Sequence, residues 1–266
     1  SAYELIQKMK EEEAEIARIE AEQAALEKEK AEKGSTGFPQ GDILSIKKLD
    51  VTNFRFRLVN KDKMTSREYG INWKDLDITS DLHCRNISVK DGYVSGSVEK
   101  GGIKEKSGYV ISSLSGQVKV GHGKTLVTEA RIYDGKSYID LQEYSMSYES
   151  MNSFRRYMEE VKMTGIINPS EVDFASLAYF APRLRDKELS VKINGADVEG
   201  TVNNLGINHM DAIIKESGIK AVLSGRLKGI PDKTKMSADA DIDDIAFTTR
   251  GLEQFLKVWG KNMNLE

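Results

Sequence analysis

The stretch Leu189–Ile230 reads LSVKINGADVEGTVNNLGINHMDAIIKESGIKAVLSGRLKGI and sets a pattern that most of the chain repeats. Apolar and polar residues alternate in short runs, which is the period of a strand with one buried face. The apolar members of these runs are Leu189, Val191, Ile193, Val198, Val202, Ile219, Ala221, Leu223 and Leu227. Glycines separate the runs and predict turns or bulges. The stretch therefore predicts a meander of antiparallel strands.

Similar runs continue from Ile43 to Tyr148, return at Val161–Ile167 and end in a predicted pair of strands within Lys235–Phe247. Gly101-Gly102 and Ser115-Gly116 are predicted as turns between strands. Leu49 and Val51 are out of phase with Phe54 and Phe56, so a bulge is expected near Thr52–Asn53. We expect a mainly β fold, an elongated and curved antiparallel sheet of roughly 12 to 16 strands with a few short helices.

Residues 1–37 differ in kind from residues 38–266. Tyr3–Lys33 holds no glycine or proline and predicts a long charged helix with a defective heptad seam, followed by the Gly34–Gly37 linker. The helix is a spacer, a segment docked on the sheet, an added segment, or a coiled-coil contact for self-association through residues 3–33. Shorter helices are expected at Glu149–Glu160, at Phe174–Phe180 after an Asp173 cap, and at Thr249–Lys261. Either terminal helix is expected to cover a sheet edge or plug the trough.

Composition excludes several classes of function. The 266 residues carry a formal net charge of -3, which leaves no basic excess for a general nucleic-acid binder. A single cysteine, Cys84, cannot form an internal disulfide. No apolar run reaches the roughly 18 residues of a transmembrane helix.

Motifs that imitate chemical sites are better explained by strands and turns. Gly123-Lys124-Thr125 resembles the end of a phosphate-binding loop, but Val118 stands where its first glycine belongs. The acids of Asp239–Asp244 imitate a calcium loop, yet they alternate with Ala238, Ala240 and Ile242 as a strand with an acidic face would. The histidines His83, His122 and His209 lack partners at metal spacing. We therefore expect no catalytic residues, no metal and no cofactor, and a protein that is not an enzyme.

Five segments together resemble the TamB translocation and assembly module family of Bacteroidetes-type bacteria, within the AsmA-like group. The segments are Tyr69–Ile78, Lys104–Val118, Leu177–Leu184, Val198–Leu205 and Leu223–Asp232. Their order carries the resemblance, which covers about Asp42 to Leu256. It implies a periplasmic section of a longer protein anchored in the inner membrane, with a hydrophobic β groove that carries phospholipid toward the outer membrane and supports outer-membrane assembly. A TamA-like outer-membrane barrel would bind a C-terminal region beyond this section.

The expected contacts of the lipid follow from the opening stretch. The candidate lining residues are Leu189, Val191, Ile193, Val198, Val202, Ile219, Leu223 and Leu227, with Lys192, Lys220, Ser224 and Arg226 facing solvent. Because period alone does not separate an open trough from a closed sandwich, a structural or protein-interaction module with a coiled-coil partner helix is the alternative.

Overall fold

A computed structural model describes residues 41–59, 68–229 and 237–260. Contacts within the chain separate Ser1–Gly37 from Phe38–Glu266, and all the described residues belong to the second unit. The predicted helix at Tyr3–Lys33 and its heptad seam lie outside the described residues.

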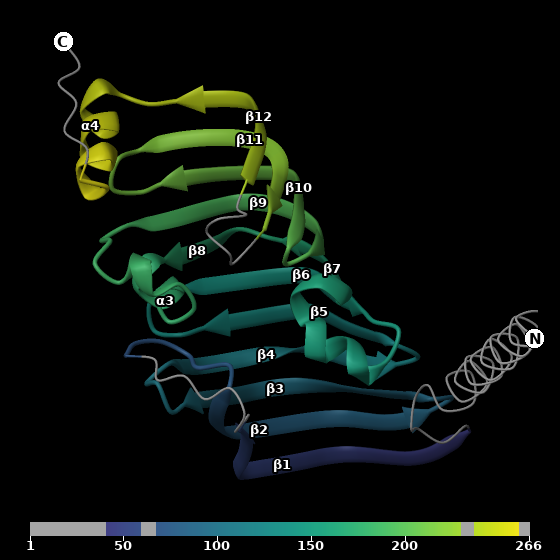
Figure 1. The fold of residues 1–266 in the computed structure, drawn as a ribbon. Coiled ribbons are helices and arrows are strands. Elements are labelled where there is room, and N and C mark those ends of the chain that lie inside the picture. The colour runs from purple at the N-terminus through teal and green to yellow at the C-terminus, as the bar shows by residue number, and fades with distance from the viewer. Residues whose placement is uncertain (1–40, 60–67, 230–236, 261–266) are drawn as a thin grey trace, which may run out of the picture. The chain divides into compact units, whose positions relative to one another are not determined.

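The described chain forms one antiparallel sheet of twelve strands, laid side by side nearly in chain order from β1 to β12 (Figure 1). The strands are β1 (Asp42–Val59), β2 (Asp75–Lys90), β3 (Tyr93–Glu105), β4 (Val110–Gly121), β5 (Lys124–Tyr133), β6 (Tyr138–Ser147), β7 (Lys162–Ile167), β8 (Ser170–Asp173), β9 (Ser190–Thr201), β10 (Asn204–Ile214), β11 (Ile219–Lys228) and β12 (Ser237–Ala246). The short β8 pairs with β6 and β9, and every other strand pairs with its neighbours along the sheet. The helices are η2 (Met151–Arg156), α2 (Tyr157–Glu160), α3 (Phe174–Leu177), η3 (Pro182–Leu184) and α4 (Thr249–Val258).

The prediction of a mainly β, long antiparallel sheet with a few short helices is confirmed, but several strands are longer than predicted. Gly101-Gly102 lies inside β3 and Ser115-Gly116 inside β4, where the sequence predicts turns. Each pair coincides with a shift in strand register, so these glycines make bulges within continuous strands. The segment Lys235–Phe247, predicted as two strands, contributes the single strand β12.

The bulge predicted near Thr52–Asn53 is confirmed. The register of β1 against β2 shifts between the pair Val51–Leu82 and the pair Phe54–Ser80. Asn53, inside this shift, has a left-handed φ of 54°. The backbone N–H of Asn53 donates to Asp81 Oδ1 at 2.7 Å, which satisfies a group that the bulge frees from the ladder. The extra residue returns Phe54 and Phe56 to the face that carries Val51.

Tight turns join neighbouring strands at two dipeptides that end in glycine. Asp91 and Gly92 have φ of 50° and 76°, and His122 and Gly123 have φ of 48° and 67°, the left-handed pairs that a two-residue hairpin turn requires. Gly123-Lys124-Thr125 is therefore a hairpin turn and the start of β5, as predicted.

Buried apolar side chains are few, and only Ala130 in β5 and Ala196 in β9 lie in strands, near the middle of the sheet. Among the described residues they are Ile71, Ala130, Val161, Ala178, Leu189 and Ala196. The helical insertion η2–α2 packs there, since the Tyr157 hydroxyl lies 3.3 Å from Met163 Sδ and 3.7 Å from Met146 Sδ. The predicted N-cap is confirmed, because Asp173 Oδ1 accepts from the backbone N–H of Ala175 at 2.7 Å.

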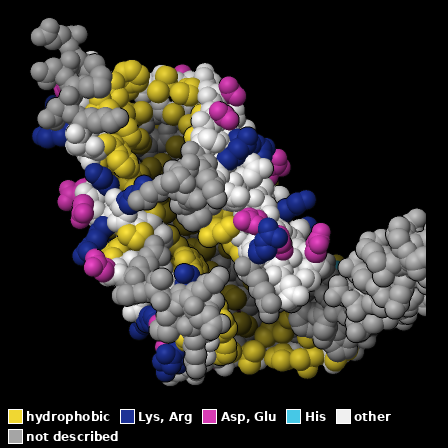
Figure 2. All heavy atoms as spheres, viewed as in Figure 1, with side chains coloured by type: hydrophobic (Ala, Val, Ile, Leu, Met, Phe, Trp, Pro, Cys, Tyr) yellow, Lys and Arg dark blue, Asp and Glu magenta, His cyan; other side chains and the backbone are white. Residues whose placement is uncertain are grey.

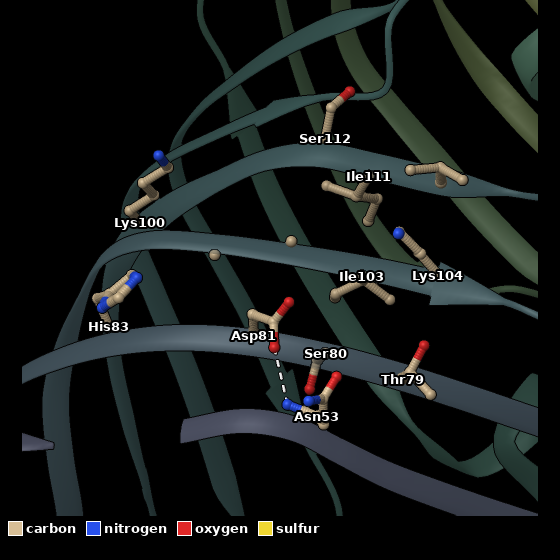
Figure 3. A pocket seen from close by; sticks show the side chains of 13 residues that line it. Asn53, Thr79, Ser80, Asp81, His83, Lys100, Ile103, Lys104, Ile111 and Ser112 are labelled. Atoms are coloured by element: carbon tan, nitrogen blue, oxygen red, sulfur yellow. Dashed lines mark hydrogen bonds between the residues drawn. The ribbon is translucent and has the colours of Figure 1, made fainter. Parts of the chain in front are cut away.

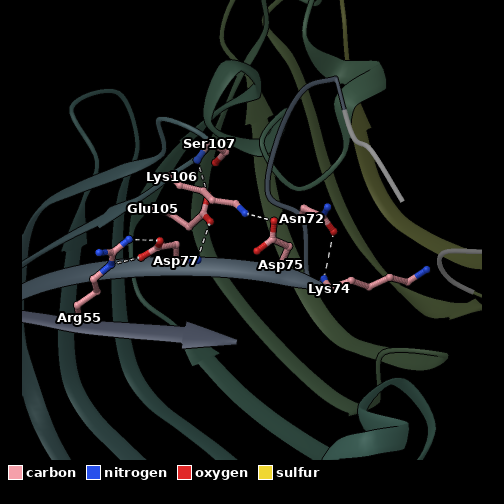
Figure 4. Close-up of polar contacts among 8 residues, drawn as sticks. All are labelled: Arg55, Asn72, Lys74, Asp75, Asp77, Glu105, Lys106 and Ser107. Atoms are coloured by element: carbon pink, nitrogen blue, oxygen red, sulfur yellow. Dashed lines mark hydrogen bonds and ion pairs between the residues drawn. The ribbon is translucent and has the colours of Figure 1, made fainter. Parts of the chain in front are cut away.

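Residues 69–74, which we call the strap, lead into β2 and link it to the segment after α3. The backbone N–H of Ile71 donates to Tyr179 O at 2.8 Å, and the Tyr179 ring lies 5.3 Å from that of Tyr69 and 5.2 Å from that of Tyr109. Polar contacts hold the end of the strap and the start of β2 against the end of β3 (Figure 4). The buried carboxylate of Glu105 accepts from the backbone N–H of Ser107 at 2.7 Å. These polar groups therefore hold a turn in place.

Candidate functional site: the apolar face of the sheet

The strongest candidate site is one face of the sheet, because apolar side chains run across it from strand to strand. Residues that pair directly in neighbouring strands point to the same side. Such pairs link seven residues on seven strands, which we call the Leu223 row: Ala130, Leu141, Ile167, Ala196, Met210, Leu223 and Ile242. The row runs from β5 to the last strand, β12, without a charged residue. We call the side that carries it the apolar face.

Most of the predicted lining residues share this face. Pairing links Val191 through Ile214 to Ile219, and Ile193 through Ala212 to Ala221. It also links Val198 to Ile207 on β10, and Leu205 on β10 to Leu227. Leu189 is buried just before β9 begins. Lys192, Lys220, Ser224 and Arg226 occupy the alternate positions and so point to the other side. Contact of these lining residues with lipid stays a prediction.

One predicted lining residue is misplaced. The alternation groups Val202 with Val198 in a strand run, but β9 ends at Thr201 and Val202 lies in the turn to β10. The reason is local: Gly200 has a φ of 116° and its position faces the backbone of Asn204, so the chain already reverses there. Val202 therefore does not belong to the wall.

The sequence prediction also missed the β10 part of the wall. Ile207 and Met210 are three residues apart and do not fit a period of two. A register shift between them restores both to the apolar face. The phase argument that found the bulge at Thr52–Asn53 would have found this one.

Figure 2 shows the apolar face as a hollow lined by hydrophobic side chains, which extends from the side of α4 toward β1. Lysine, arginine and acidic side chains gather along its margins. Within the described chain, only short helices and the strap stand on this face, so its larger side chains are half-buried or exposed. At the two outer strands exposure is high, with Phe54 52% and Ile242 56% exposed.

The opposite face is polar and carries cross-strand ion pairs. Arg55 on β1 donates through Nε to Asp77 Oδ1 at 2.7 Å, and this bond holds the pKa of Asp77 below its ordinary value. Arg85 on β2 pairs with Glu99 on β3 at 2.9 Å. On β12, Asp239, Asp241 and Asp244 also point to this side. The acidic run is thus a strand with an acidic face, as predicted.

A pocket of about 500 Å³ lies over β2, β3 and β4 (Figure 3). Asp81, His83, Lys100, Lys104 and Ser112 contribute to its lining. His83 Nδ1 lies 2.9 Å from Asp50 Oδ1, and this hydrogen bond is the main reason why the pKa of Asp50 is lowered. Asp81 Oδ1 already accepts a hydrogen bond from the Asn53 N–H. Among the described residues, no serine hydroxyl and no cysteine thiol is hydrogen-bonded to His83. The His83–Asp50 pair therefore lacks the nucleophile of a hydrolytic triad.

The described part of the chain shows neither a metal-binding cluster nor a helix that could span a membrane. It holds no group of three or more histidine, cysteine, aspartate or glutamate side chains placed to bind a metal ion. Its helices are too short or too polar to cross a bilayer. Cys84 is a free thiol whose pKa is raised, mainly by burial.

Comparison of the chain with protein-family models, with curated proteins and with solved structures finds no match.

Proposed function

We propose that this chain binds the acyl tails of phospholipid along the apolar face and passes them along it, as a section of a TamB-like lipid conduit. The observation that supports the proposal is the Leu223 row, which crosses seven strands without an interrupting charge. A soluble domain ordinarily covers such a face with a second layer. On this face the described part of the chain leaves the larger side chains half-buried or exposed.

The energetics suit a tail that slides. Burying acyl chain contributes about 0.8 kcal/mol per methylene, so a 16-carbon tail would gain about 12 kcal/mol on complete burial. An open groove covers only part of the tail and gives proportionally less. Because aliphatic side chains form most of the wall, no position on it binds the tail much better than the next. The headgroup stays in water at the charged margins.

The cellular setting of the proposal rests on the family resemblance. The chain would act in the periplasm of a Gram-negative bacterium, as part of a parent anchored in the inner membrane. A TamA-like outer-membrane barrel would be the partner of the parent protein.

The direct test is extraction of the purified protein with organic solvent, followed by mass spectrometry for phospholipid. We expect phospholipid to co-purify with the wild-type chain. Leu223→Asp places a carboxylate in the Leu223 row between Met210 and Ile242, where desolvation opposes both the charge and the passage of a tail. We expect this variant to retain about one fifth of the wild-type phospholipid or less, which corresponds to a loss of about 1 kcal/mol in binding free energy.

Lys220→Asp is the matched control. It introduces the same carboxylate on the same strand, but Lys220 alternates with Ile219 and Ala221 of the apolar face and so points to the opposite face. Both variants should keep the circular dichroism of a β protein. Equal lipid content in the two variants, or a wild-type chain free of lipid, would refute the conduit.

The open edges favour one second candidate, a protein-interaction module. Among the described residues no strand pairs with the outer side of β1 or β12, and a partner's strand can add to such an edge. A chain that is free of lipid and elutes in complex with a partner protein bound along β1 would support this alternative.

A further inference from the structure

The two outer strands of the sheet each leave one row of backbone groups without a neighbouring strand. Among the described residues, β1 pairs only with β2 and β12 pairs only with β11. The two strands lie at opposite ends of the sheet (Figure 1). The N–H and C=O groups of such an edge form a template on which a further strand can pair. Each edge is therefore a candidate interaction surface.

The helix that follows β12 does not occupy the outer edge of that strand. Gly251 in α4 packs on the backbone of Ser217, which lies in the turn between β10 and β11. At the other end of α4, Lys187 Nζ donates to Val258 O at 2.5 Å. Figure 1 shows α4 beside the ends of these inner strands, so the sequence prediction that this helix meets the sheet fits its position. The outer side of β12 is left without a neighbour among the described strands.

The outer strand β1 carries a positive charge on its polar side. Beyond the bulge, Phe54 and Phe56 lie on the apolar face, and Arg55 and Arg57 alternate with them. Arg55 is bound to Asp77, whereas Arg57 forms no ion pair with a described residue. Over its whole length β1 has four cationic and two acidic residues, a formal net charge of +2.

The other outer strand, β12, carries the opposite charge. Its ten residues include four aspartates and no cationic residue, a formal net charge of -4, and all ten are exposed. Asp239 and Asp241 point to the polar side, while Ala240 and Ile242 alternate with them on the apolar face. None of the four aspartates forms an ion pair with a described residue. The edge therefore presents an unneutralised row of carboxylates.

The signs of these charges decide which edges can meet. Like charges placed opposite each other on neighbouring strands are destabilising, and opposite charges are stabilising. Two copies of β1, or two copies of β12, would bring like charges together. The β12 of one copy and the β1 of another would bring opposite charges together. Charge therefore opposes a symmetric pairing of two identical edges and favours a head-to-tail pairing of the two different ones.

The strand directions and the faces are compatible with this pairing. The path from β1 to β12 holds eleven strands joined by ten antiparallel pairings, so its first and last strands run in the same direction. A second copy placed with its apolar face on the same side would join β12 to β1 as a parallel pair, which is only slightly less stable per residue than an antiparallel one. Phe54 and Ile242, each about half exposed, would then lie on one continuous apolar face.

We infer that the outer edge of β12 is an interaction surface for β1 of a second copy of this chain, with the acidic side of β12 against the basic side of β1. The pairing extends both the sheet and the apolar face from one copy into the next. The inference goes beyond the proposed function, because it requires no bound lipid.

The test measures self-association of the full chain by sedimentation equilibrium at several protein concentrations. We expect the average mass of the wild type to rise with concentration. Arg57→Glu places an acid on β1 and Asp241→Lys places a base on β12, so in each variant an edge meets its own sign. Each variant should associate at least about tenfold more weakly than the wild type. Lys192→Glu is the control: it changes the net charge as Arg57→Glu does, but on the inner strand β9, and should associate as the wild type does.

Mixing the two edge variants separates head-to-tail pairing from every other contact. In the mixture, the new glutamate on one copy meets the new lysine on the other, and the second type of contact has the wild-type charges. The mixture should therefore recover the mass of the wild type, although each variant alone does not associate. Circular dichroism should show the same β spectrum for all the variants.

Three results would overturn the inference. The first is a wild-type chain that stays monomeric at every concentration, and the second is a mixture no heavier than the separate variants. The third is association that survives both charge reversals, which would place the contact elsewhere, for example in the helix predicted at residues 3–33. None of these results bears on the lipid conduit, because extraction of phospholipid from a single copy tests that proposal separately.

Discussion

The middle of the sheet and its two outer strands are built from the same apolar alternation but differ in cover. Around β5–β9, short helices and close strand packing bury Ala130, Val161 and Ala196 almost completely. On β1 and β12, the same face leaves Phe54, Leu58 and Ile242 about half exposed. The Leu223 row spans both situations, from buried Ala130 to exposed Ile242. Closely packed and exposed apolar side chains therefore lie in different parts of one continuous surface.

The largest expected effect tests where stability resides. Leu189 is 3% exposed and Leu58 on β1 is 49% exposed. Leu189→Ala should lower the free energy of unfolding by about 2 to 5 kcal/mol, because it removes most of a side chain that is almost completely buried. Leu58→Ala, the matched change at the edge, should cost less than about 1 kcal/mol. Urea unfolding followed by circular dichroism measures both, and equal losses would show that the edge is as well packed as the middle.

A smaller effect tests how Ala130 is buried against the neighbouring strand β4. Gly116 on β4 has a φ of 152°, and a Cβ at this position would lie 2.9 Å from Ala130 Cβ. Gly116→Ala should therefore destabilise the sheet by about 1 to 3 kcal/mol through strain and overlap. Gly195→Ala on β9 is the control, since its Cβ would meet only Ile167 O at 3.9 Å. Thermal melts that rank the two variants in the opposite order would refute this account of the bulge.

The smallest effect tests the strap by pH. Burial, and secondarily Asp134, raise the pKa of Tyr109 to about 12 from an ordinary value of 10.0. A folded-state pKa above the unfolded one means that stability is complete below about pH 10 and declines as pH rises toward about 12. Tyr109→Phe cannot ionise, so its urea midpoint should fall less than that of the wild type between about pH 9.5 and about pH 11.5, the range that brackets an ordinary tyrosine pKa. Tyr133→Phe, on the polar face, is the control; parallel pH profiles for all three proteins would contradict the assignment.

The sequence predicts faces better than it predicts lengths. Alternation places Val191, Ile193 and Leu223 on one side because a period of two allows no mixture without a bulge. Alternation fails at glycines, because a glycine can mark either a turn or a bulge. Gly92 and Gly123 lie in turns, while Gly102 and Gly116 lie at bulges inside strands. Only pairing with a neighbouring strand separates these meanings, and pairing is not written in any single segment. The burial of Ser217 is likewise invisible in the sequence, since it depends on α4, which folds back from a distant part of the chain.

The link from Ile71 to Tyr179 gives the sheet an uneven cooperativity. In a meander, each strand touches mainly its two neighbours, so stability propagates along the strand order much as it does between the modules of a repeat protein. Such an array frays from its ends. The strap joins the start of β2 to the segment after β8 and closes the strands between them into a ring of contacts. Amide hydrogens in β2–β8 should therefore exchange as one slow group, while those of β1 and β12 open earlier and independently.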